Sequence, residues 1–141
     1  MREPMLFYTA VPVLLGGSPR VVGRLAASLY ARHGIEPHWY GRGFHPLAAL
    51  YTARHRLPSP FTEAHDGVIL RHLCDFEKGY RHTGGILCLI PCSNEAEAFL
   101  ERMRDPLEER FVLLARPNRG TDPLYGLVHS HEILERNAQN T

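Results

Sequence analysis

Apolar and polar positions alternate along this chain in blocks that predict strands and helices in turn. An apolar run at residues 11–15 predicts a strand, and a glycine pair at residues 16–17 ends it. Apolar residues then recur every three or four positions up to His33, which is the period of one buried helix face. Ser18 is a favoured N-cap and Pro19 suits the first helical position, so these two residues mark where the helix begins.

The same alternation continues along the rest of the chain. The further predicted elements are a strand within residues 35–43, a short helix at 47–51, a strand at 53–57, a helix at 66–80, a strand at 84–92, a helix from 93 to about 104, a strand at 111–115 and a helix that begins at Asp122. Pro37 favours an edge or irregular position for the second strand. Val21 and Val68 are expected among the inward-facing helix residues.

Strands that alternate with helices predict an α/β fold. We expect an open, mostly parallel sheet of about five strands with helices on both faces. The 141 residues are the size of one domain, with a predicted core at 10–116 and a C-terminal helix and polar tail at 117–141. The 44% hydrophobic and 22% charged residues are typical of a globular chain.

Charge and targeting signals narrow the partners and the compartment. A formal net charge of +1 predicts no attraction to nucleic acid or to an anionic membrane. We find no apolar run of about 20 residues and no signal-peptide cleavage site, so a cytoplasmic protein is expected. Three cysteines, Cys74, Cys88 and Cys92, are an odd set, and reduced thiols are the simplest interpretation.

The glycine turn after the first strand is the first candidate site. Gly16, Gly17 and Ser18 lie where a strand leads into a helix N-terminus, a position suited to an anion, and Arg20 adds a positive charge. The alternative is that the glycines only make the turn and Arg20 points into solvent. Both interpretations stay open at the level of sequence.

Two nucleotide motifs are excluded or disfavoured by spacing. A P-loop needs a lysine after its second glycine, and Lys78 is the only lysine in the chain. A dinucleotide fingerprint needs an acidic residue after the second strand, where this chain has Gly41, Arg42 and Gly43. Arg42 remains a weak candidate for contact with a phosphate.

Metal binding and thiol catalysis fit the sequence poorly. The pairs Cys88/Cys92 and His129/His131 lack the spacing of structural zinc ligands, so no metal site is predicted. Cys92 and Ser93 follow a strand and open a helix, which makes them weaker candidates for the same crevice as the glycine turn. A thiol-dependent enzyme that uses Cys92 is the least favoured hypothesis.

Two stretches resemble the N-terminal, pre-ATP-grasp domain of ATP-grasp carboxylate–amine ligases, in particular D-aspartate ligase-like proteins. These are "VPVLLGGSPRVVGRLAASLYARHGIEPHWYGRG" and "ILCLIPCSNEAEAFLERMRDPLEERFVLLAR". The resemblance implies a Rossmann-like domain that helps to form the pocket for a small carboxylate or amine substrate. It also implies substrate-side roles for Gly16, Gly17, Ser18 and Arg20, with Cys92 and Ser93 as weaker candidates.

The resemblance implies ATP and magnesium for a complete ligase, but this chain lacks the residues that would bind them. The family's catalysis needs several lysines on the nucleotide, and this chain has one. We therefore expect no catalytic residues, no cofactor bound by this chain alone, and a separate or missing ATP-grasp domain as partner. The chain is expected to be a fragment or a free-standing relative.

A stand-alone module with a flavodoxin-like sheet is the alternative function. It would bind a small anion or a protein and catalyse nothing. An apolar face left uncovered by a missing domain predicts pairing of two copies, and therefore a homodimer.

Overall fold

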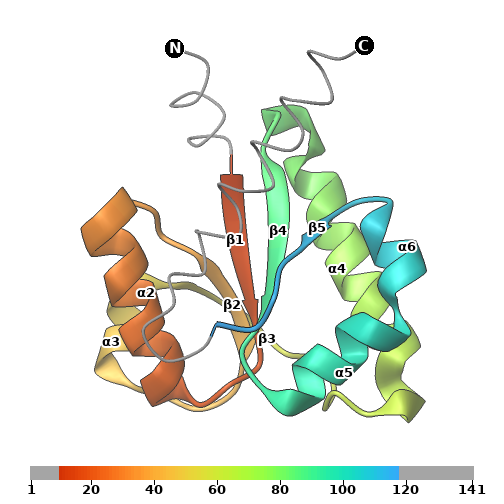
Figure 1. Cartoon of the computed structure of the whole chain (residues 1–141), viewed down its shortest axis with the longest axis horizontal. Coiled ribbons are helices and arrows are strands. Elements are labelled where there is room, and N and C mark those ends of the chain that lie inside the picture. The colour runs from red at the N-terminus through yellow and green to blue at the C-terminus, as the bar shows by residue number, and fades with distance from the viewer. Residues whose placement is uncertain (1–9, 118–141) are drawn as a thin grey trace.

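Five parallel strands form one sheet, and their order places the first strand at its centre. The computed structural model describes residues 10–117 (Figure 1). The strands are β1 (Ala10–Leu15), β2 (His38–Gly41), β3 (Ala53–Arg56), β4 (Ile86–Pro91) and β5 (Val112–Leu113). They lie in the order β3-β2-β1-β4-β5 and every neighbouring pair is parallel. The predicted α/β class and open parallel sheet are therefore confirmed.

Helices cover both faces of the sheet. On one face lie α2 (Pro19–His33) and α3 (Pro46–Tyr51); on the other lie α4 (Asp66–Tyr80), α5 (Asn94–Arg102) and α6 (Arg104–Glu108) (Figure 1). Single 3-10 turns at Glu63–His65 and Arg81–Thr83 flank α4. The strand order is that of Rossmann-type sheets, whereas flavodoxin-type sheets have the order 2-1-3-4-5.

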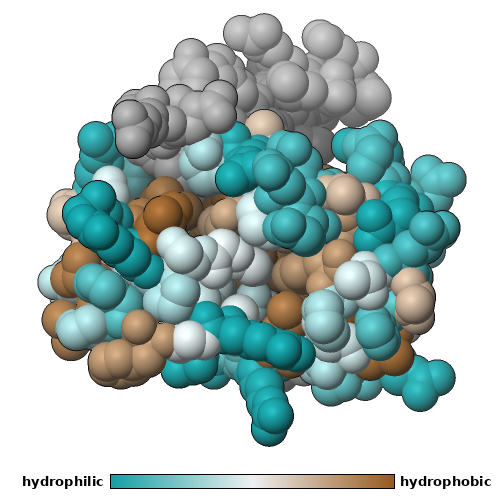
Figure 2. All heavy atoms as spheres, turned by 90° about the horizontal axis from the view of Figure 1, so that it is seen from below, coloured by the Kyte–Doolittle hydropathy of each residue, from teal (hydrophilic) through white to brown (hydrophobic). Residues whose placement is uncertain are grey.

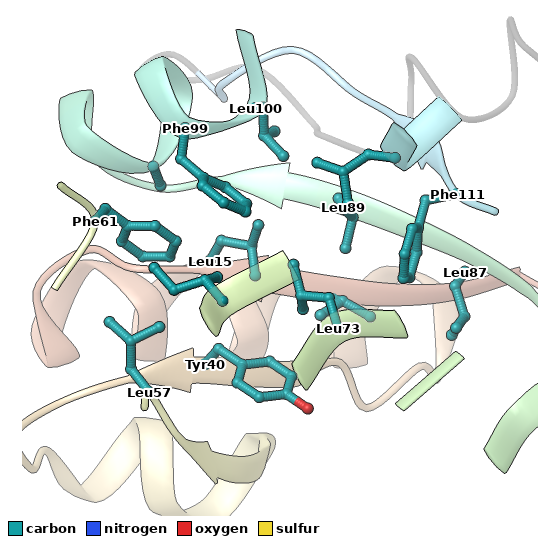
Figure 3. Close-up of a cluster of buried hydrophobic side chains, with 14 residues drawn as sticks. Leu15, Tyr40, Leu57, Phe61, Leu73, Leu87, Leu89, Phe99, Leu100 and Phe111 are labelled. Atoms are coloured by element: carbon teal, nitrogen blue, oxygen red, sulfur yellow. The ribbon is translucent and has the colours of Figure 1, made fainter. Parts of the chain in front are cut away.

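Two hydrophobic cores lie on the two faces of the sheet. Along β1, Val13 and Leu15 point into the core beneath α4, α5 and α6, while Leu14 points into the core beneath α2 and α3. Figure 3 shows the larger core; the residues it labels are Leu15, Tyr40, Leu57, Phe61, Leu73, Leu87, Leu89, Phe99, Leu100 and Phe111. Because both faces are covered, the central strands are continuous apolar runs rather than alternating ones.

The start of α2 follows the predicted capping chemistry, and a left-handed glycine closes its end. The Val21 N–H donates to Ser18 Oγ over 3.3 Å, and Pro19 is the first helical residue. At the other end Gly34 has φ 65°, and its N–H donates to the Tyr30 carbonyl over 2.8 Å. Both ends rest on contacts within a few residues, which explains why local sequence predicts them.

The second strand occupies a different place from the one predicted. β2 lies between β1 and β3, so the expectation of an edge strand from Pro37 is wrong. Pro37 precedes β2, and its carbonyl accepts the Ala53 N–H over 2.9 Å. A proline at this point removes no hydrogen bond from the ladder, because only its carbonyl is used.

Several smaller expectations also change. Val21 and Val68 are 57% and 45% exposed, respectively, although both were expected to face inward. The strand expected at 111–115 is shorter, at 112–113, and the helix expected to reach 104 ends at Arg102 before α6 begins. The helix predicted from Asp122 lies outside the described residues. Within residues 10–117, no helix combines the length and apolar character needed to span a bilayer.

Candidate functional site

A groove lies across the carboxyl ends of β1, β2 and β4. The chain runs from β1 to β2 and β3 on one side of the sheet, then crosses to β4 on the other side of β1. At such a reversal the connections leave the sheet in opposite directions and open a crevice, where α/β proteins bind ligands. Here the groove has a volume of about 560 Å³. Figure 2 shows this edge of the molecule, where hydrophilic side chains surround a paler centre and apolar patches lie between them.

The groove is lined by the β1–α2 turn, by the β4–α5 turn and by residues at or after the ends of β2, β3 and β5. Its lining residues are Gly16, Gly17, Ser18, Val21, Gly41, Arg42, Leu57, Phe61, Cys92, Ser93, Asn94, Glu95 and Arg116. Six of the seven predicted site residues are therefore brought together, and Arg20 is the exception. Arg20 is exposed on α2 and lies outside the lining.

The two glycines are required where the β1–α2 turn meets the β4–α5 turn. Gly16 has φ 70° and Gly17 has φ 85°, a backbone region that residues with a Cβ rarely adopt. A Cβ on Gly16 would lie 2.8 Å from Ser93 Oγ, and one on Gly17 would lie 2.8 Å from both Cβ and the carbonyl oxygen of Cys92. The glycines thus let the two turns approach closely, which explains them without a ligand.

Hydrogen bonds fix this junction. The Gly16 N–H donates to the Tyr40 carbonyl over 2.8 Å, and Trp39 Nε1–H donates to the Gly16 carbonyl over 2.9 Å. The Cys92 N–H donates to the Leu15 carbonyl, also over 2.8 Å. Because its polar groups are used internally, Gly16 shapes the groove and offers no free amide to a ligand.

Two helix N-termini open at the groove. Ser18 caps α2, and Ser93 caps α5 by accepting the Ala96 N–H over 3.1 Å. Inside α5 the N–H groups of Asn94 and Glu95 have no helical acceptor, because the first turn of any helix lacks one. In α2 the first position is Pro19, which carries no N–H, so α5 offers more donors to an anion.

Two arginines give the groove a positive character. Arg42 follows β2 and is exposed, whereas Arg116 follows β5 and is half-buried. The Arg116 Nη1–H donates to Asn94 Oδ1, which holds the guanidinium beside the start of α5. Glu95 is the one carboxylate among the described lining residues. Two cationic side chains that line the same groove as a helix N-terminus are an arrangement that attracts a carboxylate or phosphate.

Cys92 is a packing residue of the groove floor. Its side chain is 8% exposed, and burial raises the pKa of its thiol to about 12, although the Arg116 charge and the hydrogen bond to Leu15 act in the opposite direction. A thiol with this pKa carries almost no thiolate near neutral pH. The structure thus argues against the hypothesis of a Cys92 nucleophile. No histidine lies among the described lining residues to serve as its base.

Sequence reasoning missed Arg116, Asn94 and Glu95. Arg116 comes directly after the apolar segment "FVLLA", at the carboxyl end of a predicted strand, and the rule that singled out Ser18 and Ser93 would have found it. The histidines weighed as metal ligands, His129 and His131, lie outside the described residues. Among residues 10–117, no three side chains of His, Cys, Asp or Glu form a metal-binding group.

Comparisons with protein-family models, characterised proteins and solved structures give no match to this chain. The strand order and the groove therefore carry the functional argument.

Proposed function

We propose that this chain is a Rossmann-like domain that binds a small anion, a carboxylate or a phosphate, in the groove at the carboxyl edge of its sheet. The observation that carries the proposal is that Arg42, Arg116 and the N-terminus of α5 converge on one groove at the reversal of strand order. The glycine turn sets the shape of the groove, and the two arginines supply the charge.

The occupant is proposed to be small and to carry at least one carboxylate. The apolar side chains of Leu57 and Phe61 line part of the groove, and Glu95 lines it together with the two arginines. A carboxylate would meet the guanidinium groups, and an amine on the same molecule would meet Glu95. An amino acid, or a short acid that carries an amine, combines these features.

Within a larger assembly, we propose that the chain acts as the substrate-side domain of a carboxylate–amine ligase of the ATP-grasp kind. The resemblance noted above and the Rossmann-type strand order support this role. The ligase would take ATP and magnesium in a different domain, because this chain has one lysine and its groove holds one carboxylate among the described residues. A stand-alone anion-binding module is the second candidate, and the same observation favours it.

Isothermal titration of the purified chain tests anion binding. The probes are inorganic phosphate, acetate, succinate and D-aspartate at low ionic strength. We expect binding of at least one probe, and a loss of about a hundredfold in affinity when Arg42→Gln and Arg116→Gln are combined, since a hydrogen bond to a charged group contributes about 1.5–3 kcal/mol.

A matched control removes the same charge elsewhere. Arg71 is exposed on α4, so Arg71→Gln changes the net charge by the same amount per residue without touching the groove. Equal losses in Arg71→Gln and in either groove variant would show that only net charge matters, and the proposal would fail. Sequencing the gene past codon 141 then separates the two roles: an open frame with a lysine-bearing segment supports the ligase, and a stop codon supports the stand-alone module.

A further inference from the structure

Three hydrogen-bonded titratable side chains connect the edge strand β3, through β2, to α4. None of the three lines the groove. His38 Nδ1 and His55 Nε2 lie 2.9 Å apart, and the Tyr80 hydroxyl lies 2.8 Å from His38 Nε2. His55 belongs to β3, His38 to β2 and Tyr80 to the last turn of α4. The two hydrogen bonds therefore connect three elements that are far apart in the sequence.

Aromatic rings enclose the two imidazoles. Tyr40 stacks on His55 with ring centroids 4.7 Å apart, and the Phe76 ring is T-shaped to both His38 and His55, with centroids 4.9 Å and 5.0 Å away. These contacts leave both histidines half-buried, where a positive charge is less well solvated than in water.

Among the residues that the structure describes, no carboxylate compensates a charge on His38 or His55. Within residues 10–117, Tyr40 and Tyr80 are the other titratable groups that face the imidazoles from β2 and α4. On β3, Arg54 lies over the Trp39 ring on the opposite face of the sheet. On α4, Glu77 is paired with Arg81 and Arg110.

The number of protons on His38 and His55 decides whether the hydrogen bond between their rings survives. With both imidazoles neutral, one nitrogen of the facing pair carries a hydrogen and the other accepts it. One added proton preserves this pattern, because a neutral ring still accepts from a charged one. A second proton places an N–H on both His38 Nδ1 and His55 Nε2, so the hydrogen bond is lost and two positive charges face each other.

We propose that the hydrogen-bonded side chains His55, His38 and Tyr80 form an acid-sensitive latch that fastens the edge strand β3 to β2 and α4 and releases β3 when both histidines are protonated. β3 has four residues and pairs with β2 alone, so its attachment rests on that one ladder and on the packing of His55 against Tyr40 and Phe76. Leu57, the residue after β3, lines the groove, so release of β3 also alters one groove wall. The latch stands independently of the proposed anion binding.

The shifted pKa values agree with this chemistry. Burial, followed by the charge on His55, lowers the pKa of His38 to about 4, and burial lowers the pKa of His55. A group whose pKa is lower in the closed state stabilises that state fully above its pKa in the open state, which is near 6.5. The stabilisation is then lost as the pH falls from about 6.5 toward 4, and the two rings titrate as a coupled pair.

Amide hydrogen exchange at pH 7 and pH 5 tests the latch on the unmodified chain. We expect the protection factors of β3, including the Ala53 amide that donates to Pro37, to fall about tenfold more than those of β1 between these two pH values. We expect no more than this tenfold fall, because solvent reaches the half-buried imidazole rings and weakens the effect of their charges. Equal falls in β1 and β3 would overturn the proposal.

Two variants separate titration from packing. His55→Gln keeps a hydrogen-bonding group without a titratable ring, and we expect it to abolish the selective loss of β3 protection at pH 5. His72→Gln, at an exposed position of α4, is the matched control and should behave like the unmodified chain. A selective loss that persists in His55→Gln would contradict the latch.

A measurement on the unmodified chain remains decisive if His55→Gln does not fold. The ring nitrogens of His38 and His55 are titrated by NMR. Apparent pKa values below 6 for the pair support the latch, and values at or above 6.5 for both rings overturn it.

Discussion

The groove and the histidine latch both use residues of β2 or next to it, but their polar side chains have different partners: those of the latch bond to one another, and those of the groove can bind a ligand. Along β2, His38 directs both ring nitrogens to partners inside the protein, whereas Arg42, just past the strand, lines an open groove. In the latch a change of protonation acts on stability, because each polar group already has a partner. In the groove charges remain available to a ligand, so substitutions there should act on binding.

The largest expected effect comes from the junction beneath the groove. Gly17→Ala places a Cβ 2.8 Å from the Cys92 carbonyl oxygen at φ 85°, so both backbone strain and a clash oppose folding. We expect a loss of about 3 kcal/mol in the free energy of unfolding, measured by urea denaturation.

Gly34→Ala is the control for this substitution. Gly34 has φ 65°, but a Cβ there meets nothing within 4 Å, so strain acts without a clash. We expect a loss of about 1 kcal/mol. Equal losses for Gly17→Ala and Gly34→Ala would show that the close approach of the two turns contributes nothing.

Substitution of either groove arginine should weaken anion binding and leave the free energy of unfolding nearly unchanged. Arg116→Gln and Arg42→Gln are each expected to weaken anion binding about tenfold, with unfolding free energies within about 0.5 kcal/mol of the unmodified chain. Calorimetric titration and urea denaturation of the same samples give the two quantities. A loss of stability above about 1 kcal/mol would make the arginines structural residues.

Removal of the Tyr80 hydroxyl at the end of the latch should lower the stability of the fold without changing its affinity for an anion. Tyr80→Phe keeps the ring packing on Phe76 and removes the hydrogen bond to His38. We expect a loss of about 1 kcal/mol at pH 7 and unchanged anion affinity. Thermal unfolding and calorimetric titration check the two halves of this prediction, and weaker anion binding would show that the groove and the latch are coupled at pH 7.

Substitution of Arg20 should have the smallest effect on anion binding. It is exposed outside the groove, so Arg20→Gln is expected to change anion affinity less than about twofold, as a distant surface charge does in salt. A tenfold loss would return Arg20 to the site and contradict the geometry described above.

Local chemistry explains what could be predicted from the sequence. The bounds of α2 follow from its caps and its apolar periodicity, and those of α4 follow from apolar periodicity, since no side chain caps its start; the structure confirms both helices. Ser18, Ser93 and the glycine pair could be placed at one sheet edge because the carboxyl ends of parallel strands lie together.

Features that depend on distant segments could not be predicted in this way. Val21 has the periodicity of a buried residue but lines the groove and is 57% exposed. The latch joins His38 to His55 and Tyr80, which are 17 and 42 positions away in the sequence. Neither contact of the latch has a local signal, because the first depends on which strands become neighbours and the second on where α4 packs against the sheet.

The most direct test of the account is to map where a small anion binds. Phosphate and D-aspartate are titrated into the isotopically labelled chain while its amide resonances are followed. We predict that the largest shifts fall on Gly17, Ser18, Asn94 and Glu95, and that they vanish when Arg42→Gln and Arg116→Gln are combined. Shifts spread evenly over the surface, or their absence at millimolar anion, would contradict the claim that this groove is the functional site.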